Sequence, residues 1–112
     1  MDNEIKTWLF DIWQSINEID SYYEGKPKKF EEYVKDIKTK RAVERNLEII
    51  GEAVNRVLKK DKDFPLNNAA RIVGTRNRII HGYDKITDDM VRSIVINHLP
   101  KLKEEVEELL NE

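Results

Sequence analysis

Cysteine is absent from the 112 residues, and glycine and proline are scarce, with four and three residues respectively. The absence of cysteine excludes disulfides and thiolate-ligated metal sites. The four glycines are well separated along the chain, so none of them builds a phosphate-binding loop. With only two histidines in the chain, we expect neither a metal nor a cofactor.

Long hydrophobic runs are also missing. No apolar stretch approaches the roughly 18 residues that a membrane span needs. The first residues lack the basic start and apolar stretch of a secretory signal. A chain of 112 residues fits one domain, so we expect a single domain over residues 1–112, in the cytoplasm and without a membrane partner.

Helical periodicity fills the chain. Apolar residues recur every three or four positions, which predicts main helices over residues 3–23, 39–60, 67–80 and 87–112 and a short helix over 30–36. Asp2 or Asn3 is expected to cap the first helix, and Thr87-Asp88-Asp89 to start the last. Gly82 is expected to stop the third main helix, and Pro100 to kink or restart the fourth. The pattern predicts an all-α, up-and-down bundle of four main helices plus a short one.

Charge is unevenly distributed, although the formal net charge is only −2. Residues 1–24 carry one lysine against six acids, whereas residues 25–62 carry twelve basic residues against seven acids. Residues 71–83 contain three arginines and no acid. A local basic surface on a mildly acidic protein is one interpretation. The other is that these charges coat solvated helix faces.

One segment gathers polar side chains suited to phosphate chemistry, namely Arg76, Asn77, Arg78, His81 and Tyr83. Asn77 and His81 are four residues apart, so they share a helix face on which the amide can orient the imidazole. Arg76 and His81 are five residues apart, about 140° around an ideal helix. We therefore expect that a frayed helix end or a twofold dimer brings them together.

Such a set of groups suits the cleavage of RNA. A guanidinium binds two phosphate oxygens and stabilises the charge that grows in the transition state. An imidazole titrates near neutrality and moves protons. RNA carries its own nucleophile, the 2′-hydroxyl, so no metal is required. The alternative from the residues alone is that Arg76 forms a surface ion pair and that His81 interacts with a helix dipole.

The order of these residues resembles a known family. Arg76-Asn77, three residues, His81, one residue and Tyr83 resembles the signature of the HEPN superfamily. The wider setting is similar to the HepT toxin family, whose partner is the MntA nucleotidyltransferase antitoxin. The matching motifs lie over residues 41–53, with Ile-Gly-Glu-Ala at 50–53, and over 72–77 and 99–102. The similarity covers about residues 30–110.

The resemblance implies a HEPN-like homodimer with an RNA-cutting site at the interface between the subunits. Arg76 and His81 would be catalytic, with Asn77 and Arg78 as supporting polar residues. Tyr83 matches the tyrosine that the antitoxin modifies with AMP, and the added phosphate and bulk would block RNA. The implied function is a metal-independent endoribonuclease toxin of a type II toxin–antitoxin pair, acting on transfer RNA or messenger RNA.

Two other functions are compatible with the same residues. The chain is alternatively a non-catalytic subunit that binds a nucleotide or substrate beside a nucleotidyltransferase, or a structural helical dimerisation domain. In the long second helix, Arg45 and Glu52 are expected either to form a buried pair or to line the cleft.

Overall fold

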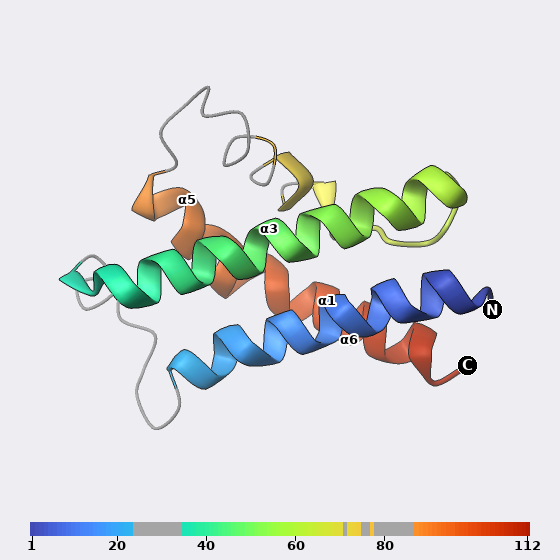
Figure 1. Cartoon of the computed structure of the whole chain (residues 1–112), viewed down its shortest axis with the longest axis horizontal. Coiled ribbons are helices and arrows are strands. Elements are labelled where there is room, and N and C mark those ends of the chain that lie inside the picture. The colour runs from blue at the N-terminus through green and yellow to red at the C-terminus, as the bar shows by residue number, and fades with distance from the viewer. Residues whose placement is uncertain (24–34, 71, 75–76, 78–86) are drawn as a thin grey trace.

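The computed structural model describes residues 1–23, 35–70, 72–74, 77 and 87–112. Four α-helices, which Figure 1 labels, and one π-helical turn lie within this part of the chain. They are α1 (Asn3–Tyr22), α3 (Ile37–Lys60), α5 (Asp88–Ser93), the π-helical turn η1 (Ile94–His98) and α6 (Leu99–Leu110). Residues 70, 72–74 and 77 are also helical, and no strand occurs among the described residues. The all-α, four-helix fold class is confirmed.

Helices α1 and α3 pack against each other and run in opposite directions (Figure 1). Asp2 caps α1, because its carboxylate accepts hydrogen bonds from the backbone N–H groups of Glu4 and Ile5 at 2.8 and 3.1 Å. Asp36 caps α3 in the same way and accepts from the backbone N–H of Thr39 at 3.1 Å. The predicted cap of the first helix is thus confirmed. The long helix begins two residues before its predicted start.

The core lies where α1, α3 and α6 meet and is built from the predicted apolar positions. Burying one leucine, isoleucine or valine side chain stabilises the fold by about 1.5–3 kcal/mol. The fully buried aliphatic residues of these three helices are Leu9, Ile12, Ile16, Ile19, Val43, Leu47, Ile50, Val54, Val57, Leu102 and Val106. Their spacing of three or four residues is the spacing that the sequence displayed, so the same pattern defines both the helices and their inward faces.

The last helical stretch changes its winding just before Pro100. The backbone N–H of Leu99 donates to the carbonyl oxygen of Ile94, five residues earlier, and residues Ile94–His98 form a π-helical turn. Proline lacks an N–H and its ring collides with the carbonyl four residues before it in a regular α-helix. The wider turn accommodates that ring, and α6 then continues to Leu110. The predicted restart at Pro100 is confirmed, whereas its π-helical form was not anticipated.

Several helix boundaries differ from those that the sequence predicts. Asp36 was expected inside a short helix but is extended, because its carboxylate is used to cap α3; Lys35 is helical, and residues 30–34 lie outside the described part. The third main helix begins at residue 70 rather than 67, and the predicted stop at Gly82 lies outside the described residues. Within the described residues, no helix is both long and apolar enough to cross a membrane.

Candidate functional site

Most of the predicted active segment lies outside the part of the chain that the structure describes. This holds for Arg76, Arg78, His81 and Tyr83. Asn77 is described: it is helical and its side chain is exposed. The assignment of these five residues to a site therefore stays a prediction. The structure describes instead how the two flanks of the segment are attached to the bundle.

The flank that leads into the segment is held by apolar burial and by a carboxylate. Leu66, Ala69 and Ile72 are buried, with Ile72 fully enclosed. Glu105 of α6 accepts hydrogen bonds from the backbone N–H of Asn67 at 2.9 Å and of Asn68 at 3.3 Å. Its second carboxylate oxygen accepts from the side-chain amide of Asn68 at 3.1 Å. The chain between α3 and the following helix is thus fixed to α6.

The flank that follows the segment is held by a cap and an ion pair. The last helical stretch begins where the sequence predicted, and the Thr87 hydroxyl caps α5 by accepting from the backbone N–H of Met90 at 3.2 Å. The ammonium nitrogen of Lys40 on α3 lies 3.0 Å from Oδ1 of Asp88 and 3.3 Å from its Oδ2. Both side chains are about a quarter exposed or less, at 22% and 25%. This pair joins the start of α5 to the first turns of α3.

A buried amide sets the register between α1 and α3. Asn46 is 4% exposed; its Oδ1 accepts from the Tyr22 hydroxyl at 2.6 Å and its Nδ2 donates to Glu18 at 2.8 Å. Burial of the ring, followed by the negative charge of Glu18, raises the pKa of Tyr22. The phenol therefore stays a neutral donor to Asn46 at physiological pH.

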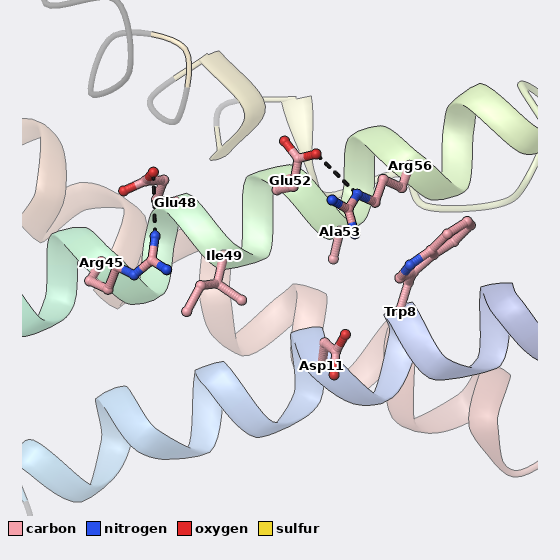
Figure 2. A pocket seen from close by; sticks show the side chains of 8 residues that line it. All are labelled: Trp8, Asp11, Arg45, Glu48, Ile49, Glu52, Ala53 and Arg56. Carbon is pink, nitrogen blue, oxygen red and sulfur yellow. Dashed lines mark hydrogen bonds and ion pairs between the residues drawn. The ribbon is translucent and has the colours of Figure 1, made fainter.

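A groove lies between α1 and α3, with a volume of about 370 Å³ (Figure 2). Two ion pairs line its α3 wall: Arg45 lies 3.4 Å from Glu48, and Arg56 lies 3.0 Å from Glu52. Trp8 from α1 covers one end. The lining residues are Trp8, Asp11, Arg45, Glu48, Ile49, Glu52, Ala53 and Arg56.

The charge of this groove does not favour a phosphate ligand. Two arginines against three carboxylates leave a formal charge of −1 on the lining residues. The arginine side chains are 67% and 57% exposed, and ion pairs this exposed contribute about 0–1 kcal/mol each. Arg45 and Glu52 do not pair with each other, as had been considered, but both line this groove. The groove beside Arg45 and Arg56 is thus a poor match to a ligand that carries phosphate.

The match of the chain to a family model shows which protein family it belongs to. The model of the HepT-like ribonucleases, described as "Ribonuclease HepT-like", matches residues 12–109. The chain belongs to the HepT-like ribonuclease family. The matched region includes the second half of α1, the whole of α3 and the predicted active segment, and it ends in the last turn of α6.

Curated relatives of this HepT-like chain carry ribonuclease names. "Putative RNase MJ0127" of Methanocaldococcus jannaschii is 33% identical over 113 residues, covering 97% of this chain and 89% of the relative. "Putative RNase MJ1380" of the same organism is 36% identical over 106 residues, covering 93% and 94%. "Putative RNase TTE0752" of Caldanaerobacter subterraneus subsp. tengcongensis is 35% identical over 85 residues, covering 72% and 73%. No solved structure matches the chain significantly.

Sequence reasoning missed the polar contacts that attach the two flanks of the predicted active segment to the bundle. Glu105 meets residues 37 and 38 positions earlier, and Lys40 meets Asp88, 48 positions later. Asn46 sits on a helix face whose other inward residues are aliphatic, which is the one signal that marked it as a buried polar group. Among the described residues, no three His, Asp or Glu side chains gather closely enough to hold a metal ion.

Proposed function

We propose that this HepT-like chain is a metal-independent endoribonuclease and the toxin of a type II toxin–antitoxin pair. The observation that carries the proposal is the family match over residues 12–109, which contains Arg76, Asn77, His81 and Tyr83 in the order of the family signature. The attachment of both flanks of this segment to the bundle supports it, because a catalytic segment must be held in a fixed geometry.

The proposed reaction uses the nucleophile of the substrate. His81 takes the proton from a ribose 2′-hydroxyl, whose oxygen then attacks the adjacent phosphorus. Arg76 stabilises the negative charge that grows on the phosphate oxygens. The bond from phosphorus to the 5′-oxygen breaks; that oxygen takes up a proton from water, and the imidazolium of His81 returns its proton to the solvent. The products are an RNA end with a 2′,3′-cyclic phosphate and an RNA end with a 5′-hydroxyl.

The proposed site is completed by a second copy of the chain. On an ideal helix Arg76 and His81 point about 140° apart, so one straight helix does not aim both at one phosphate. A twofold dimer in which the active segments meet places an arginine and a histidine in a shared cleft. Asn77 and Arg78 would line that cleft as supporting polar residues.

Silencing of the toxin is proposed to act through Tyr83. A nucleotidyltransferase antitoxin would transfer AMP from ATP to the phenol oxygen, with release of pyrophosphate. The added phosphate is negatively charged and bulky, so it would repel RNA from the cleft beside it.

A cleavage assay in EDTA tests the activity. Purified protein should cut RNA and leave 2′,3′-cyclic phosphate ends, and the rate should fall as the salt concentration rises. His81→Ala and Arg76→Ala should each reduce the rate by about 10²-fold or more. Arg56→Ala and His98→Ala are the matched controls, since they remove the same groups elsewhere on the bundle. Cleavage by both site variants at the rate of the controls would refute the site.

A second assay tests the control by the antitoxin. The chain is co-expressed with a neighbouring nucleotidyltransferase, and intact mass and peptide mapping should locate added AMP on Tyr83. Tyr83→Phe should then escape silencing while still cutting RNA. A fully silenced complex in which Tyr83 carries no AMP contradicts this part of the proposal. A chain that never cuts RNA but co-purifies with the transferase supports the non-catalytic alternative instead.

A further inference from the structure

The residues just before the predicted active segment bind a single carboxylate, that of Glu105 near the end of the sequence. Three donors of two consecutive residues meet Glu105: the backbone N–H groups of Asn67 and Asn68 and the side-chain amide of Asn68. Their distances to its oxygens are 2.9, 3.3 and 3.1 Å. One side chain of α6 thus fixes both the position and the orientation of this peptide segment.

The helical residues that follow have an alanine at their capping position. They begin at residue 70, and the carbonyl of Ala69 accepts the backbone N–H of Val73 at 3.1 Å, which makes Ala69 the capping position. Alanine has no side-chain acceptor, so it cannot satisfy the free N–H groups at a helix start. The carboxylate of Glu105 brings a negative charge to this end, where the helix dipole favours it.

The hydrogen bonds to Glu105 fix the chain directly before the described helical residues 70, 72–74 and 77. Displacements of about 1 Å between reacting groups can reduce a catalysed rate by about 100-fold.

We infer that Glu105 is a positioning residue for RNA cleavage, which rests on the function proposed above. It acts through Asn67 and Asn68, which it fixes at the start of the stretch that leads along the sequence to Arg76 and His81. Glu105 is anionic and bound to the protein backbone, so it is not a group that holds RNA phosphate. Its loss should lower kcat and leave KM for RNA nearly unchanged.

The experiment compares Glu105→Ala with Glu108→Ala, which removes an exposed carboxylate from the same helix. Both kcat and KM are measured on RNA in EDTA, together with thermal unfolding of each variant. We expect Glu105→Ala to lower kcat by about 10- to 100-fold with KM within about twofold. Glu108→Ala should cut like the unmodified protein. In Glu105→Ala the amide hydrogens of Asn67 and Asn68 should also exchange faster with solvent.

A compensating pair makes the test specific to the hydrogen-bond geometry. In Glu105→Gln one amide oxygen still accepts both backbone N–H groups, but the new NH₂ faces the NH₂ of Asn68, so kcat should be intermediate. Adding Asn68→Asp supplies an acceptor to that NH₂ and should restore most of kcat. If Glu105→Ala destabilises the fold, this pair and Asn68→Ala still report the contact.

The outcomes separate this inference from the proposed function. If the unmodified protein cuts RNA and Glu105→Ala cuts at the rate of Glu108→Ala, the positioning role is wrong while the ribonuclease proposal stands. If kcat falls only in proportion to the unfolded fraction, Glu105 is merely structural and the inference is also wrong. If the unmodified protein does not cut RNA, the proposed function fails and the inference fails with it.

Discussion

Replacing Asn46 by alanine should measurably weaken the contact between α1 and α3. The change removes a neutral hydrogen bond from Tyr22 and a bond to the carboxylate of Glu18. Typical net contributions are about 1 kcal/mol for the neutral bond and about 1.5–3 kcal/mol for the charged one. Both partners reach water, which can replace the lost contacts, so we expect a loss of about 2 kcal/mol in the free energy of unfolding. For a chain of this length that corresponds to a Tm lower by about 8 °C.

Urea and thermal unfolding at one fixed protein concentration measure this loss, because association of the chain would add to its stability. Asn55→Ala, an exposed change of the same type on α3, should stay within about 0.5 kcal/mol of the unmodified protein. Tyr22→Phe removes only the neutral bond and should cost about 1 kcal/mol. A double-mutant cycle between Asn46 and Tyr22 isolates their coupling. If Asn46→Ala and Asn55→Ala have the same free energy of unfolding and the same Tm, the buried hydrogen bonds of Asn46 contribute nothing and our reasoning is refuted.

Three further changes test other parts of the fold. Leu47→Ala, at a fully buried position, should lower the free energy of unfolding in urea by about 2–5 kcal/mol, and a smaller loss would mean that the core collapses around the cavity. Thr87→Ala should cost about 1 kcal/mol because it removes the cap of α5, whereas Thr87→Ser should restore it; equal Tm values would contradict the cap. The backbone N–H of Ile5, and next the contact with Lys60, lower the pKa of Asp2 below 3.8, so its stabilisation is present above pH 3.8 and is lost as the pH falls through the lowered value. Asp2→Asn keeps a capping side chain but should flatten this acid limb of the Tm-versus-pH curve, and an unchanged limb would assign it to other carboxylates.

The helices and the core were predictable because they follow from local and periodic features. The caps at Asp2 and Thr87 use a side chain within three residues of the amide that it binds. The buried aliphatic residues repeat at helical spacing, so a pattern read along the chain identifies them. Pro100 disrupts any regular helix, so a change there was expected without knowledge of the fold.

The polar contacts were not predictable, since they depend on which helices become neighbours. Glu105 is one of five glutamates within residues 104–112, and nothing in its local sequence marks it as the one that binds Asn67 and Asn68. The same holds for Lys40 among the basic residues of α3 and for its partner Asp88. At Asp36 the prediction was wrong: the pattern placed this residue inside a helix, but it is extended and its carboxylate caps α3.

The candidate catalytic residues were predicted in a third way, because neither periodicity nor packing identifies a pair of residues that cleaves phosphodiesters. An arginine and a histidine five residues apart are compatible with a surface ion pair as well as with catalysis, and only the order of residues in the family signature separates the two. The structure shows in addition how the surrounding helices hold both ends of this segment. The segment with these residues joins two stretches that are fixed to α6 and α3 by Glu105 and Lys40, both outside the signature. A chain that keeps the signature but loses these contacts should therefore retain the chemistry while losing the geometry that makes it fast.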